Sequence, residues 1–211
     1  MKKFELTAEF VTNVFGKKLF RIKALVAFGD VEKGELGGFI EKEDNLSHDD
    51  NAWVYGNAQV SGNARVSGNA WVSGNAQVFG NAWVSGNARV CGNAQVFGNA
   101  QVSGNAWVSG NAWVSGNAQV SGNAWVSGNA RVSGDADYAV VAGFGRYFRT
   151  TTFFRCKDKI LRVQCGCFYG DLAQFREIVK KTHGDSKYAK EYLAIADLME
   201  LHFSDECGCE Q

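Results

Sequence analysis

Valine recurs at every sixth position from Val54 to Val132, and an alanine stands two residues before each of these valines. In an extended chain, alternation places alanine and valine on one face and the variable residue and the following serine on the other. The Gly-Asn step between units favours a turn, because glycine and asparagine tolerate positive φ. Glycine and β-branched valine at this density disfavour a helix. The pattern therefore predicts short strands separated by tight corners.

A short period also predicts how these strands associate. One six-residue unit cannot bury its own apolar face, so the units must stack on one another as a solenoid. Three strands would close an eighteen-residue coil, and the fourteen units amount to under five coils. The chain contains no proline, which suits strands whose amides all donate to the neighbouring coil. We expect a mainly β protein with a parallel β-helix over residues 48–138.

The ends of such a solenoid need caps, because they expose unpaired backbone. Residues 1–47 are predicted to form an N-terminal β cap, with apolar runs at 10–15 and 19–28 flanking a hairpin turn at 16–18. The segment 34–47 then leads toward the first coil.

Residues 139–211 are predicted to form a C-terminal α/β cap. Runs at 146–154 and 159–168 suggest a hairpin turned at Lys157-Asp158. Asp171 and Gln174 form a capping-box pattern at the start of a helix, and Gly184 is expected to end it. Either Asp185 or Ser186 begins a second helix.

Composition narrows the functional classes. The chain of 211 residues carries 22 basic and 22 acidic residues, so bulk charge gives no argument for nucleic acid or an anionic membrane. Its apolar runs are too short for a membrane span. We expect a soluble, cytoplasmic protein that does not associate with a membrane.

Cysteine is the first candidate for chemistry. Five of the six cysteines fall in the terminal module, namely Cys156, Cys165, Cys167, Cys207 and Cys209. Two Cys-Gly-Cys pairs fit zinc poorly, because zinc sites usually separate paired cysteines by two to four residues. Alternate strand positions for Cys165 and Cys167 are the simpler interpretation, and a metal site is the alternative. We expect no bound metal and no cofactor.

Histidine is the second candidate. Acyl transfer requires a base, yet no coil contains a histidine, and the three in the chain are His48, His183 and His202. His183 and His202 are best explained as helix-end residues. We therefore expect no catalytic residues.

Aromatic residues supply the remaining signal. With three strands per coil, every third unit lies on one side, and one such column carries Trp53, Trp71, Arg89, Trp107 and Trp125. Phe79 and Phe97 stack elsewhere. The column either stabilises the solenoid or an oligomer contact, as cross-strand aromatic pairs do, or forms an exposed platform for a ligand.

Several motifs together indicate a family. The chain resembles the bacterial and phage hexapeptide-repeat proteins related to the YdcK-type transferases. The resemblance rests on the Gly-Asn-Ala-x-Val array and on four flanking segments, residues 37–43, 45–47, 165–168 and 182–185. The resemblance implies a left-handed β-helix and frequent carriage by phages. The transferase label of that family follows from its fold, and a fold does not establish a function.

The leading hypothesis is a non-enzymatic phage or prophage solenoid that acts as an oligomeric binding protein. A dimer or trimer is expected, with a host protein or a small molecule as a further partner in a bacterial cell. Counter-defence is one role that this setting suggests. The alternative is an acyl- or nucleotidyl-type transferase that uses clefts between subunits.

Overall fold

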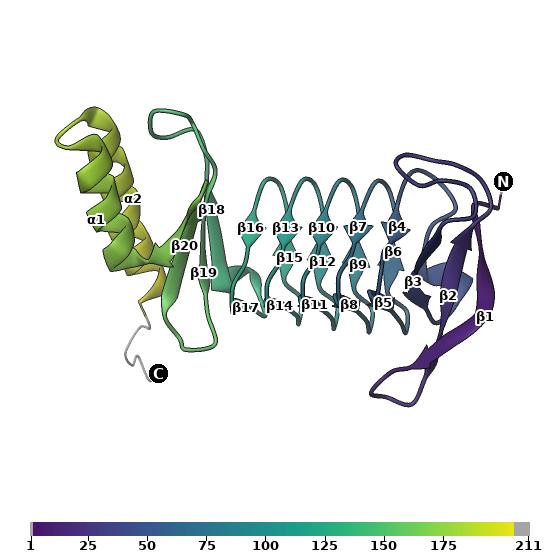
Figure 1. Cartoon of the computed structure of the whole chain (residues 1–211). Coiled ribbons are helices and arrows are strands. Elements are labelled where there is room, and N and C mark those ends of the chain that lie inside the picture. Colours follow the sequence, from purple (N-terminus) through teal and green to yellow (C-terminus); the bar gives the residue numbers. More distant parts are fainter. Residues whose placement is uncertain (1, 205–211) are drawn as a thin grey trace.

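The computed structural model describes residues 2–204 of the chain. Its middle is a solenoid, with a β cap at the N-terminal end and a module of strands and two helices at the C-terminal end (Figure 1). The prediction of a mainly β solenoid with two caps is confirmed, and the solenoid has about five turns.

Fourteen two-residue strands build the solenoid, and they pair in parallel on three sides. The first side contains β4 (Trp53–Val54), β7 (Trp71–Val72), β10 (Arg89–Val90), β13 (Trp107–Val108) and β16 (Trp125–Val126). The second contains β5 (Gln59–Val60), β8 (Gln77–Val78), β11 (Gln95–Val96), β14 (Trp113–Val114) and β17 (Arg131–Val132). The third contains β6 (Arg65–Val66), β9 (Trp83–Val84), β12 (Gln101–Val102) and β15 (Gln119–Val120).

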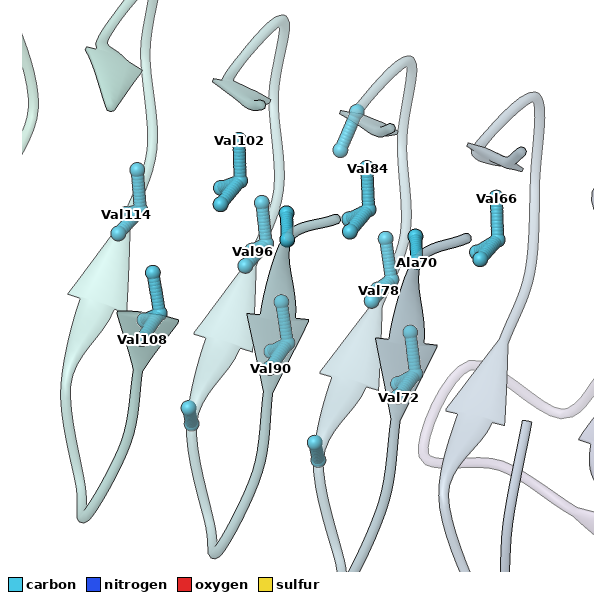
Figure 2. Packing of buried hydrophobic residues seen from close by; sticks show 14 of the residues in the cluster. Val66, Ala70, Val72, Val78, Val84, Val90, Val96, Val102, Val108 and Val114 are labelled. Carbon is cyan, nitrogen blue, oxygen red and sulfur yellow. The ribbon is translucent and has the colours of Figure 1, made fainter. Parts of the chain in front are cut away.

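The core of the solenoid consists of the repeated alanines and valines, which are at most 1% exposed. Figure 2 shows the valines of successive coils pointing into the interior. Each valine pairs with the valine eighteen residues later, as in Val72↔Val90, so the eighteen-residue coil is confirmed. Every glycine of the Ser-Gly-Asn type of corner has positive φ, with Gly92 at 71°.

Asparagine adds a feature that the turn argument did not predict. At ten corners the asparagine side-chain amide donates to the asparagine eighteen residues later, for example from Asn87 to Asn105 at 3.0 Å. Three such ladders run along the corners. The asparagines therefore connect neighbouring coils as well as turning the chain.

The N-terminal hairpin is confirmed: β1 (Phe4–Thr12) pairs antiparallel with β2 (Lys18–Ala24). β3 (Leu36–Ile40) joins this hairpin to the solenoid, because it pairs antiparallel with β2 and parallel with β5. Close approach requires Gly38 here, since an added Cβ would lie 2.6 Å from the Ala58 carbonyl oxygen. A short 3-10 helix, Glu43–Asn45, follows β3.

Two side chains fasten this cap to the first coil. The buried Asn45 amide donates to the carbonyls of Gly62 and Ala64, at 3.1 and 2.8 Å. Lys3 is only 3% exposed, and its ammonium donates to three carbonyls in residues 49–52. Burial lowers the pKa of Lys3 to about 8.

The C-terminal module begins with a 3-10 helix, Asp135–Asp137, and a four-stranded antiparallel sheet. Its strands are β18 (Tyr138–Val141), β19 (Thr151–Arg155), β20 (Leu161–Cys165) and β21 (Phe168–Asp171). The predicted hairpin is present as β19 and β20, but the expectation that its first strand begins at Arg146 is wrong. Residues 142–150 form a loop, in which Gly143 and Gly145 have positive φ.

The two predicted helices are α1 (Leu172–His183) and α2 (Lys187–Phe203). Asp171 accepts from the Gln174 amide at 2.8 Å, and the Gln174 side chain accepts from Asp171 in return, so the capping box is confirmed. Gly184 ends α1, and the Ser186 hydroxyl oxygen caps α2. Of the two residues proposed for the second start, Ser186 is the cap.

β19 is the junction between the two parts. Phe154 belongs to the solenoid core, whereas its neighbour Phe153 belongs to the core of the module. The Thr152 hydroxyl accepts from the Trp125 amide at 3.0 Å, at the last coil of the first side. The module therefore covers the end of the solenoid, as a cap must.

Candidate functional site

The aromatic column on the first side has the register that the repeat predicts. Trp53 pairs with Trp71, Arg89 lies between Trp71 and Trp107, and Trp107 pairs with Trp125. The five residues are thus consecutive rungs of one sheet.

Trp53 is nevertheless not a surface residue, which corrects the expected ladder. Its side chain is fully buried, and its ring packs against Phe28 at 5.3 Å and Phe4 at 6.2 Å. The N-terminal cap covers this first coil, which an argument from the repeat alone could not include. The exposed part of the column runs from Trp71 to Trp125.

The remaining rings of the column use their faces for one another. Trp107 and Trp125 are parallel, with ring centres 5.0 Å apart and an interplanar angle of 5°. The Trp71 ring stacks on the Tyr55 ring, with their centres 4.2 Å apart. The Arg89 guanidinium also lies near Trp71, 5.7 Å from the ring centre. Because stacking covers one face of each of these rings, the geometry fits the stabilising ladder.

A second set of contacts, which includes Tyr55 with Trp71, has a spacing of sixteen residues. Each exposed indole leans over the residue sixteen positions earlier, which follows the valine of the preceding coil. The Trp83 indole nitrogen donates to the Ser67 hydroxyl at 3.0 Å, and that of Trp107 donates to the Cys91 sulfur at 3.0 Å. Trp125 repeats the contact with Ser109 at 3.4 Å. Counting pairs at this spacing would have revealed it from the sequence.

The second side carries a longer aromatic series, which we call the aromatic strip: Phe15, Phe79, Phe97 and Trp113. Phe79 and Phe97 stack at 5.0 Å with their rings parallel, as expected. Phe15 of the β1–β2 hairpin extends the series at 5.7 Å, and Trp113 continues it at 6.0 Å. The Arg131 guanidinium covers Trp113 at 4.1 Å. The sequence predicted only the pair of Phe79 and Phe97, which replace the serine that follows the valine in most repeats. Phe15 lies in the hairpin and Trp113 at a variable position, so neither was expected beside them.

His48 has a structural environment at the N-terminal end of the solenoid. Its ring stacks on Phe4 at 4.3 Å, its Nδ1 accepts from the Lys3 amide, and its Nε2 lies 3.7 Å from the Glu43 carboxylate. Both ring nitrogens thus have partners within the cap.

The other two histidines lie at the opposite end of the molecule, in the helices (Figure 1). His202 packs its ring against Phe203. His183 ends α1, as predicted, and it lines a pocket of about 190 Å³ together with Cys165 and Cys167. The structure therefore brings His183 and two of the five terminal cysteines together, and it separates His48 and His202 from them.

The cysteines of this module have distinct environments. The Cys165 sulfur accepts from the Thr151 hydroxyl at 3.2 Å. Cys156 is buried at the end of the solenoid core, where burial raises the pKa of its thiol. Cys207 and Cys209 lie outside the described residues. Within residues 2–204, no three side chains of His, Cys, Asp or Glu gather as metal ligands would.

These features define a parallel β-solenoid repeat protein with a cap at each end. Comparison with known families matches the YdcK beta solenoid repeat at residues 58–74, 76–92, 94–110, 100–116 and 118–134. Matches that start at 58, 76 and 94 are one coil apart. The matches and the solenoid together show that residues 58–134 are built from YdcK-type β-solenoid repeats.

A search among curated proteins found no match. The left-handed sense and the phage association that the resemblance implied stay predictions. Neither helix in the described part of the chain combines the length and the apolar character needed to cross a membrane.

Proposed function

We propose that this protein is a non-enzymatic interaction protein whose solenoid associates with further copies of itself along the aromatic strip. The observation that carries the proposal is the character of the second side. Its rings form one continuous series that leaves the solenoid and continues onto the N-terminal hairpin.

Exposure at both ends of the strip supports this proposal. Trp113 is 39% exposed and Phe15 is 63% exposed, and the neighbouring hairpin residue Val14 is 85% exposed. The half-buried rings of Phe79 and Phe97 connect these exposed ends, and exposed apolar groups that are joined in this way are typical of interaction surfaces.

The charge pattern of the second side also suits a protein interface. The variable positions beside the strip are the uncharged Gln59, Gln77 and Gln95, and the one cation, Arg131, is engaged by Trp113. Interface centres are depleted in charge and enriched in aromatic residues. A formal net charge of zero opposes self-association least, which favours a second copy as the partner.

Rigidity adds a further argument. The backbone of each coil donates to the next coil, and the asparagine ladders repeat these connections at the corners. A surface held in this way loses little conformational entropy on binding, which improves affinity. The repeat therefore provides a pre-organised face, and the transferase alternative has no comparable support, since the three histidines are dispersed.

Subunit number tests the proposal. We expect the full-length protein to be a dimer or trimer by light scattering, and Phe97→Ser with Trp113→Ser to yield a monomer. Trp71→Ser with Trp107→Ser is the matched control, because it removes two rings from the first side instead. A double variant of the second side that keeps the subunit number of the natural protein would refute the proposed interface.

A monomeric natural protein would also refute self-association. It would redirect the same strip toward a different protein, such as the host-cell partner of a phage counter-defence protein, which is the narrower role that the resemblance suggests.

A further inference from the structure

We infer that the pocket in the C-terminal module binds a small organic anion, with an apolar body and one carboxylate or phosphate group. This inference goes beyond the proposed function and does not depend on the subunit number. Four elements surround the pocket: the β18–β19 loop, the β20–β21 turn, α1 and α2.

The walls of the pocket are largely apolar. Phe168, Phe175, Ile178 and Val179 line it, and the volume is about 190 Å³. Typical ligand pockets measure roughly 300–1,000 Å³, so the occupant must be small. An aromatic ring or a short aliphatic chain fits these walls by burial of apolar area.

Two guanidinium groups provide the charge. Arg146 and Arg149 line the pocket, and their guanidinium carbons lie 5.5 and 5.0 Å from the centre of the Tyr147 ring. None of the lining residues is acidic. Among residues 2–204, neither arginine forms a salt bridge, whereas Arg162 and Arg176 of the same module do. Arginine recognises carboxylate and phosphate through paired hydrogen bonds, so this pocket has the donors for an oxyanion.

The loop that carries these arginines is attached to α2. The Gly145 amide donates to the Glu191 carboxylate at 2.9 Å, and the Tyr192 hydroxyl donates to the Phe144 carbonyl. Glycine is needed at 145, because an added Cβ would collide with the Tyr192 ring. The attachment places both arginines beside the pocket, and Glu191 is occupied by the loop.

Close packing fixes Arg149 from the other side. An added Cβ on Gly166, in the β20–β21 turn, would lie 2.7 Å from the Arg149 Nη1 atom. The guanidinium therefore lies against the turn between Cys165 and Cys167. This contact explains why residue 166 is a glycine.

Polar groups inside the pocket complement an anion as well. Burial raises the pKa of Tyr192 to about 12, so its hydroxyl stays neutral at physiological pH and adds no negative charge to the pocket, while its proton is donated to the Phe144 carbonyl. Thr182 adds a second hydroxyl to the lining. The pocket thus combines donors, two cations and an apolar wall.

Four probes test this inference by calorimetry on the full-length protein. Benzoate carries a carboxylate on a phenyl ring, and phenyl phosphate carries a phosphate on the same ring. Benzamide is the neutral analogue, and inorganic phosphate lacks the ring. We expect at least one of the two ring anions to bind at least tenfold more tightly than benzamide and than inorganic phosphate. Which of the two binds more tightly distinguishes a carboxylate ligand from a phosphate ligand.

Variants locate the binding. Arg146→Met and Arg149→Met are each expected to weaken binding roughly tenfold or more, which is the range for a hydrogen bond to a charged group. Both side chains are exposed, so folding should persist. Lys181→Met, an exposed cation of α1 outside the lining, is the matched control and should bind as the natural protein does. Ile178→Glu should abolish binding by adding a carboxylate to the wall.

Three results would overturn the inference: equal binding of benzoate, phenyl phosphate and benzamide, no binding of either ring anion at millimolar concentration, or unchanged binding in both arginine variants. Light scattering on Arg146→Met should show the natural subunit number, which separates this test from that of the aromatic strip.

Discussion

The solenoid and the C-terminal module solve the problem of burial in opposite ways. The solenoid fills its core with two residue types in a repeated register, and each coil contacts its neighbours. The module builds its core from several residue types in no regular order, including Phe153, Phe175, Tyr192 and Met199. The module also surrounds a pocket with cations, thiols and a histidine.

This difference teaches where distinctive chemistry arises in such a chain. A repeat places the same backbone environment at every corner, so its variable positions produce long surfaces rather than enclosed sites. An irregular module brings together residues that are distant in the chain, such as Arg149 and His183. We therefore propose extended contacts for the solenoid and small-ligand binding for the module.

The largest expected effect comes from separating the two cores at β19. Phe153 and Phe154 are both fully buried, but they face the module and the solenoid respectively. Either Phe→Ala change should lower the free energy of unfolding of the part that loses the ring by about 3–5 kcal/mol. Hydrogen exchange by mass spectrometry should show deprotection of α1 and α2 in Phe153→Ala, and of the last coils in Phe154→Ala.

The contrast between the two variants is itself the control, because the substitutions are adjacent and chemically identical. Equal deprotection of both parts by either variant would mean that the two cores unfold as one unit, and the comparison would fail.

A smaller effect concerns the N-terminal cap, where pH should act through Lys3. Burial places its pKa at about 8, below the value of about 10.4 for an unfolded lysine. Between these values the unfolded chain binds more protons than the folded chain, so stability should rise with pH, by at most about 3 kcal/mol. Below pH 8 the full cost of the buried charge is present.

Denaturant unfolding from pH 7.5 to 10 measures this rise. Lys3→Met should be less stable overall, because three carbonyls lose their donor, yet its stability should lack the rise that Lys3 contributes. Lys2→Met, which removes an exposed partner of Glu43, is the matched control and should retain the natural pH dependence. Identical pH curves for Lys3→Met and the natural protein would contradict the assignment.

The smallest effect is expected from the column on the first side. Trp107→Ser removes one stacked pair and one indole hydrogen bond, and should cost about 0.5–1.5 kcal/mol beyond the loss of buried area. Thermal unfolding measures the change, with Gln101→Ser on the third side as a control without ring contacts. A loss no larger than that of the control would mean that the column contributes no stacking energy.

The sequence predicted the solenoid in detail because its period directly encodes the register: Val72 and Val90 could be paired by counting. The capping box at Asp171 was equally readable, since its contacts are local. The burial of Trp53 could not be predicted from the sequence, because it depends on Phe4 and Phe28 of the N-terminal cap.

The pocket also could not be predicted from the sequence, because it too depends on contacts between distant segments. Arg146 and Arg149 were placed on an expected strand, and only the attachment of Gly145 to α2 turns that segment into a loop beside His183. Contacts between distant, non-repeating segments decide such sites.

Native mass spectrometry of the full-length protein tests the central claim most directly. The account predicts a dimer or trimer, with Phe97→Ser and Trp113→Ser giving monomers while Trp71→Ser and Trp107→Ser leave the assembly intact. An unchanged assembly in the Phe97 and Trp113 variant, or a monomeric natural protein, would contradict it.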